Sequence, residues 1–179
     1  MKLRKGFTLV ELLIVIVIIG ILAGAMLLAS GAATASAEAS NIVNNLRSLN
    51  SASLLFYADN MDELLDPAAP SPLVRLGRAP NDIQNLLDYT NNPAAPVWDN
   101  YEFIFADGIG DAHAAQVWWA SANVARGDVA TRLEGRSGSV GLYSQAYDSD
   151  DLVGLAPDYV APGAQVFMLL RNPAAADNP

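Results

Sequence analysis

The chain has 179 residues, of which 52% are hydrophobic, so it is long and apolar enough for one folded domain with an appendage. This composition excludes a disordered chain and a collagen-like repeat. The chain contains no cysteine, which excludes disulfides, thiolate metal sites and a cysteine nucleophile. Its formal net charge of −9 opposes attraction to phosphates, so no nucleic-acid partner is expected.

The N-terminus combines a basic cluster with a long apolar stretch. Lys2, Arg4 and Lys5 come first, and residues 7–29 follow with a single charge, at Glu11. As a helix, the uncharged residues after Glu11 would span about 27 Å, close to the hydrocarbon thickness of a bilayer. Because the basic residues precede the span and the acidic body follows it, we expect a cytoplasmic N-terminus and an exported remainder.

Three interpretations of this N-terminus compete. A plain signal anchor explains the basic flank and the span, but it leaves the carboxylate of Glu11 unexplained. A secretory signal peptide would end at residues 35–37, where Ala-Ser-Ala has the small-x-small form of a signal-peptidase site, although its apolar region would be long. In the third interpretation the chain is cut before the apolar segment, within residues 6–11, and the segment stays in the mature protein.

Residues 5–13 read Lys-Gly-Phe-Thr-Leu-Val-Glu-Leu-Leu, after a short basic leader and before a long apolar stretch. This segment resembles the N-terminus of type IV prepilins and type II secretion pseudopilins, over roughly the first thirty residues. The resemblance implies that a membrane-embedded prepilin peptidase cuts between Gly6 and Phe7 and methylates the new amino group of Phe7. It also implies a homopolymeric filament and an inner-membrane assembly platform as partners.

Glu11 is a charged residue within the apolar segment, and the cost of placing it in a bilayer indicates a functional role. A carboxylate within a bilayer costs about 2.5–3.5 kcal/mol on insertion scales, so an intramembrane acid is by default functional and has a partner. A cut after Gly6 would create that partner, a cationic amino group on Phe7 within about one helical turn. The pair could form within one subunit or between neighbours, and the resemblance implies the arrangement between neighbours. The alternative is an acid at headgroup level that has no assembly role.

A helix is predicted to continue far beyond the membrane, because no proline occurs before Pro67. One helix could run over residues 7–65, about 90 Å long. Its second half carries an apolar face at helical spacing, made of Ile42, Leu46, Leu49, Ser53 and Phe56. That face requires a partner, and the rest of the chain supplies the obvious one.

The remainder of the chain is predicted to form a small antiparallel sheet. Strands are expected within residues 101–105, 116–124, 140–147 and 165–170, and short helices within residues 81–89 and 128–134. The sequence therefore predicts an α+β fold, in which the sheet packs on the exposed half of the helix, as in pilins. Trp118 and Trp119 must point to opposite faces of one strand, so we expect at most one of them in the core.

Little in the sequence supports catalysis, and no enzyme activity is expected. His113 is the single histidine and is expected at the surface or at a strand start. Ser137 and Ser139 do not lie in a Gly-x-Ser-x-Gly motif. No resident cofactor is expected, although the carboxylates of one acidic loop could bind calcium, the alternative being a solvated turn. The residues of this candidate calcium site are Asp148, Asp150 and Asp151.

The chain divides into a leader (residues 1–6), a membrane and assembly helix (7–29), an amphipathic continuation (30–65) and a globular head (66–179). We expect a structural subunit of a type IV pilus-like filament, held in the bacterial inner membrane with its head outside the cytoplasm until it assembles. One alternative is the major pseudopilin of a type II secretion system, whose filament is periplasmic. A further alternative is a monomeric domain, either secreted or kept on a signal anchor.

Overall fold

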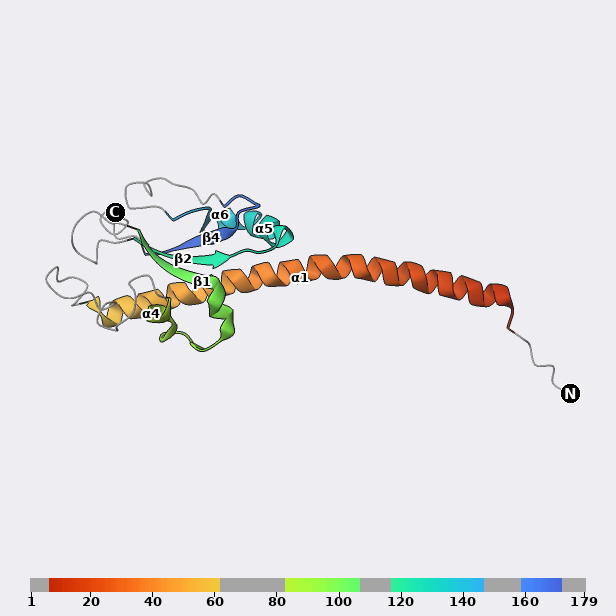
Figure 1. Cartoon of the computed structure of the whole chain (residues 1–179), viewed down its shortest axis with the longest axis horizontal. Helices are drawn as coiled ribbons and strands as arrows, with labels where there is room; N and C mark the ends of the chain where they lie inside the picture. Colours follow the sequence, from red (N-terminus) through yellow and green to blue (C-terminus); the bar gives the residue numbers. More distant parts are fainter. Residues whose placement is uncertain (1–6, 62–82, 107–116, 147–158, 172–179) are drawn as a thin grey trace.

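The computed structural model describes residues 7–61, 83–106, 117–146 and 159–171. One long helix, α1 (Leu9–Asp59), runs from the N-terminal end into the head and along its whole length (Figure 1). The helix ends where the Asn60 side chain and backbone N–H both donate to the carbonyl oxygen of Phe56, at 2.8 and 3.1 Å. The predicted single helix is confirmed over this range, and residues 62–65 of the prediction lie outside the described residues.

The described strands form one antiparallel sheet, in the order β1-β2-β4-β3. Its two long central strands, β2 and β4, pair along most of their length, while β3 is short and β1 lies at the other edge. The strands are β1 (Tyr101–Ala106), β2 (Val117–Asn123), β3 (Leu142–Tyr143) and β4 (Gln165–Arg171). A sheet packed on the second half of a long helix is the predicted α+β, pilin-like architecture.

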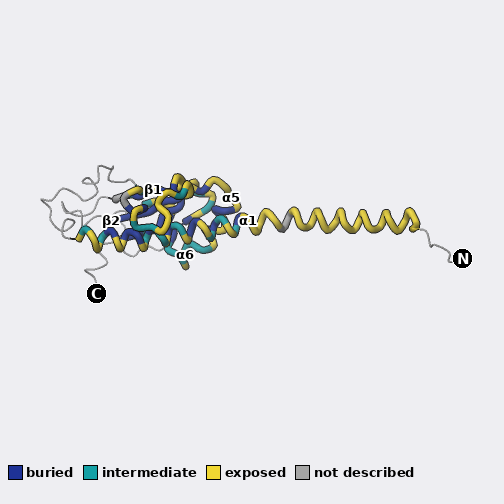
Figure 2. Tube along the Cα trace, turned by 90° about the horizontal axis from the view of Figure 1, so that it is seen from below, coloured by how far each residue is buried: buried dark blue, intermediate teal, exposed yellow. Residues whose placement is uncertain are grey.

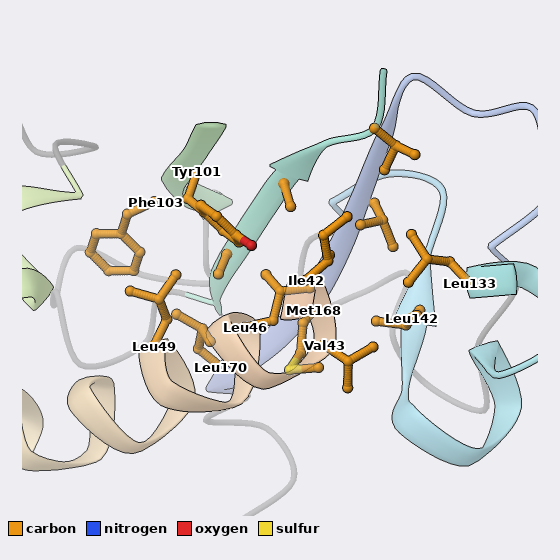
Figure 3. Close-up of a cluster of buried hydrophobic side chains, with 14 of the residues drawn as sticks. Ile42, Val43, Leu46, Leu49, Tyr101, Phe103, Leu133, Leu142, Met168 and Leu170 are labelled. Carbon is orange, nitrogen blue, oxygen red and sulfur yellow. The ribbon is translucent and has the colours of Figure 1, made fainter. Parts of the chain in front are cut away.

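The main core lies between α1 and one face of the sheet. The predicted apolar face of α1 is the buried one, since Ile42, Leu46, Leu49, Ser53 and Phe56 are all less than 9% exposed. Figure 3 shows side chains of this face meeting side chains from the strands. Among the strand residues in this cluster are Phe103, Met168 and Leu170. The head is therefore built around α1.

Trp118 and Trp119 correct one expectation. Their side chains do lie on opposite faces of β2, but both are fully buried, so the prediction that at most one enters a core is wrong. Trp118 packs edge-on against Phe56 of α1, with ring centroids 5.9 Å apart. Trp119 packs against Tyr143 at 5.1 Å, in a second cluster with Val117 and Phe167. The sheet thus has an apolar core on each face.

The smaller elements also depart from the predicted boundaries. The strand expected over residues 140–147 shrinks to β3, because the chain before it turns through a helix, α6 (Ser137–Val140). The helix expected over residues 81–89 is α4 (Gln84–Leu87), which buries Leu86 and Leu87. A 3-10 helix, η1 (Pro96–Asn100), leads into β1, and the helix expected over residues 128–134 is α5 (Gly127–Glu134).

Two arginines beside α5 fasten the head to α1 close to the apolar half. Arg126 donates to Glu38 Oε2 at 3.1 Å and to Asp128 Oδ2 at 2.6 Å, and Arg136 donates to Ser40 Oγ at 2.9 Å. The hydrogen bond from Arg126 lowers the pKa of Asp128, and the same pairing raises the pKa of Arg126. Because these ion pairs are exposed, they position the head more than they stabilise it.

Replacing Leu46 by Ala tests whether α1 is the spine of the head. Leu46 is 0% exposed, so L46A should lower the free energy of unfolding by about 2–5 kcal/mol through lost burial and a cavity. Leu54 lies on the same helix and is 59% exposed, so L54A should change stability by less than about 0.5 kcal/mol. Denaturant unfolding of both variants in detergent is the measurement, and equal losses would contradict this packing.

Candidate functional site

The N-terminal end of α1 is closed by a capping box between Thr8 and Glu11. The backbone N–H and the hydroxyl of Thr8 both donate to Glu11 Oε2, each at 2.8 Å. The backbone N–H of Glu11 donates back to Thr8 Oγ1 at 3.2 Å. The role of Thr8 is not among the predictions, although Thr-x-x-Glu at a helix start is the sequence signature of this motif.

The capping box holds the carboxylate of Glu11 beside the start of the helix. It satisfies N–H groups that the first turn of α1 leaves without a helical partner, and it supplies two donors to a carboxylate that lipid would not solvate. Phe7 precedes this turn in non-helical conformation, with its side chain 74% exposed. The structure therefore brings three predicted or newly found residues, Phe7, Thr8 and Glu11, into one turn of chain.

The rest of the predicted processing site precedes Phe7. Gly6 and the basic leader residues Lys2, Arg4 and Lys5 lie outside the described residues. The structure places Phe7, the residue after the proposed cut, next to the N-cap residue Thr8. A new amino group on Phe7 would be the immediate neighbour of the Thr8 N–H that donates to Glu11.

The apolar half of α1 is uncovered by the rest of the described chain. Its large side chains from Leu9 to Leu27 are between 44% and 81% exposed. Figure 2 shows the contrast along one helix, exposed over this half and buried where the head begins. By length and composition α1 is able to cross a membrane. Such a surface is stable only in lipid or against other apolar helices.

The small-x-small sequence at residues 35–37 lies inside α1, and its first residue, Ala35, belongs to the head core. Ala35 is 1% exposed, Ala39 is 0% exposed, and Glu38 is held by Arg126. A cut after residue 37 would divide α1 at the place where the head is fastened to it. The amphipathic half of α1 is thus continuous in structure with the apolar half.

The other chemical candidates form no site within the described residues. His113 and the acidic loop of residues 148–151 lie outside them, so the calcium prediction stays a prediction. Within the described ranges no group of three or more His, Cys, Asp or Glu side chains could hold a metal ion. The hydroxyls of Ser137 and Ser139 donate to the backbone carbonyls of Glu134 and Arg136, each at 2.9 Å, as turn-stabilising contacts.

Comparison with known proteins identifies the N-terminal segment. The family model described as the prokaryotic N-terminal methylation motif matches residues 1–27. No curated protein and no solved structure matches the chain. The matched segment contains the capping box and most of the uncovered apolar half of α1. Residues 1–27 are the prepilin cleavage and methylation motif of type IV pilins and pseudopilins, joined here to a head of pilin-like α+β architecture.

Proposed function

We propose that this protein is a structural subunit of a type IV pilus-like filament. The observation that carries the proposal is α1 itself, whose apolar half is uncovered and whose other half is the spine of the folded head. In the membrane, lipid covers the apolar half. In a filament, the apolar halves of other copies replace the lipid, and the heads lie outward.

The proposed route begins in the inner membrane. The basic leader keeps the N-terminus cytoplasmic, and the head folds outside the cytoplasm. Prepilin peptidase then cuts between Gly6 and Phe7 and methylates the amino group of Phe7. An assembly platform in the same membrane passes the processed subunit into the filament, where Glu11 pairs with the Phe7 amine of a neighbouring copy and sets its stagger.

A type II secretion pseudopilus is the second candidate for the filament. The absence of cysteine favours it, since pilins of the better-known kind often close the head with a disulfide and pseudopilins commonly lack one. Both candidates use the same processing and the same helix. They differ in whether the filament reaches the cell surface or stays in the periplasm.

A monomeric secreted domain fits the structure poorly. Release after residue 37 would remove Ala35 from the head core, where it is 1% exposed, and would start the chain at Glu38, which binds Arg126. A simple signal anchor keeps the helix whole and leaves Glu11 only its role in the cap, whereas a filament also gives its charge a partner in a neighbouring copy. The capping box and the uninterrupted helix therefore support the filament subunit.

Replacing Gly6 by Leu tests the proposed cut. We expect G6L to remain in the membrane as the long form that keeps the six leader residues, because the peptidase needs a glycine before the cut. Gly24→Ala is the matched control, since a Cβ at Gly24 meets no other atom within 4 Å. Immunoblots of the envelope distinguish the uncleaved form from the shorter cleaved form, and normal cleavage of G6L would contradict the proposal.

Replacing Glu11 by Gln tests the proposed assembly role. Gln keeps an oxygen that accepts from Thr8, so the helix cap survives while the charge is lost. We expect normal cleavage and about tenfold fewer filaments, which corresponds to a loss of about 1.4 kcal/mol per subunit contact.

The control for this test is Glu102→Gln, which removes the charge of an exposed glutamate on β1. The measurement is the amount of protein in filaments sheared from cells, relative to the amount in the membrane. E11Q filaments at the wild-type level would show that the charge of Glu11 has no role in assembly.

A further inference from the structure

The charges of the head are distributed unevenly along α1. We define the base of the head as residues 126–136, which comprise α5 and its flanking residues and lie at the end of the head nearest the apolar half of α1 (Figure 1). Four arginine side chains are described, and three of them, Arg126, Arg132 and Arg136, belong to the base. Two of these three bind Glu38 and Ser40 of α1.

The opposite end of the head is acidic. We define the distal end as Asp59, the last residue of α1, together with Asp88, which follows α4. Both are exposed, and both lie near Tyr89, whose ring packs against Phe56 at 5.7 Å. Burial raises the pKa of the Tyr89 phenol, and the negative charges of Asp59 and Asp88 raise it further. Along α1, the distal end lies about 28 Å beyond Ser40, at 1.5 Å per residue.

Arg132 is the cation of the base that is available to another molecule. It lies in the last turn of α5 and is exposed. Within the described part of the chain its side chain makes no hydrogen bond or ion pair, whereas Arg126 is engaged by Glu38 and Asp128. Glu134 is exposed as well, and so are the paired Arg126 and Asp128. The base as a whole is therefore close to neutral, in a head that is strongly acidic.

Copies of this chain share one orientation. The basic leader fixes the same side of the membrane for every N-terminus, so copies that leave the membrane together are parallel. When parallel copies are displaced along the direction of α1, the base of one approaches the distal end of the next. A contact between two different surfaces of identical subunits forms an open filament when each copy is also displaced along the axis, because the displacement prevents closure into a ring.

We propose that the base of one head docks on the distal end of another copy, with Arg132 facing Asp59 and Asp88. This inference rests on the proposed filament function and adds the surface by which neighbouring heads recognise each other. Identical acidic heads repel one another, and this contact places a guanidinium against two carboxylates, a pairing that is favourable and directional. The contact also fixes the relative orientation of two neighbouring heads.

Cysteine cross-linking tests the contact directly, because the chain has no cysteine of its own. In the full-length protein, Thr131→Cys labels the base beside Arg132 and Ala58→Cys labels the distal end beside Asp59, so the proposed charges stay in place. The control pair is Asn44→Cys with Ala58→Cys, in which the first thiol is exposed midway along the head portion of α1. Sheared filaments are treated with a short bis-maleimide and run on a denaturing gel.

The expected result is a ladder of multimers from T131C/A58C, about tenfold stronger than from the control pair, because a docked contact raises the effective concentration of the two thiols. Normal filaments with no ladder above the control would overturn the docking contact and leave the filament function intact. Failure of the wild-type protein to appear in any filament would overturn the filament function itself.

A charge exchange gives a second, independent readout. Arg132→Glu should lower the filament yield about tenfold, since like charges placed opposite one another disfavour a contact. Adding Asp88→Arg should restore most of the yield, whereas the matched reversal Arg47→Glu, at an exposed arginine in the head portion of α1, should leave it unchanged. Equal yields from R132E and the wild type would contradict the proposal.

Discussion

The continuity of α1 is the constraint on which the rest of the structure depends. The first half of this helix has an apolar surface that is unfavourable in water. The second half has the buried face around which the head core is built. Because the two halves are one element, the head cannot leave the membrane without taking the apolar half with it. Under the proposed function, extraction of the subunit from the membrane and burial of its apolar half among other copies are therefore one step, which follows export of the head.

The two ends of the apolar half are marked by different kinds of contact. At its start, Glu11 is held by the two donors of Thr8, so the carboxylate is oriented before any neighbour arrives. Beyond its end, Arg126 and Arg136 tie the head to α1 at Glu38 and Ser40. The cap fixes the orientation of the carboxylate that the proposed pairing with a processed Phe7 would use. The arginine contacts set how far from the membrane the folded head begins.

Much of the architecture follows from local sequence patterns, and the long-range contacts do not. Helical spacing predicted the buried face of α1, because periodicity reports which side of a helix is apolar. Strand alternation placed Trp118 and Trp119 on opposite faces, but it carries no information about a second cluster that buries Trp119. The contact between Arg126 and Glu38 joins residues 88 apart in the sequence, which no local pattern encodes. The capping role of Thr8 could have been predicted from the sequence, since its spacing to Glu11 is a known capping signature.

The intact mass and the N-terminal residue of the protein recovered from its own cells test the central claim most directly. The account predicts a chain that begins at Phe7, carries one added methyl group and retains the whole of α1. A chain that begins at Glu38 would contradict it, since the apolar half would then be a discarded signal peptide. A chain that still begins at Met1 in filaments would also contradict it, because no amino group would exist on Phe7 to pair with Glu11.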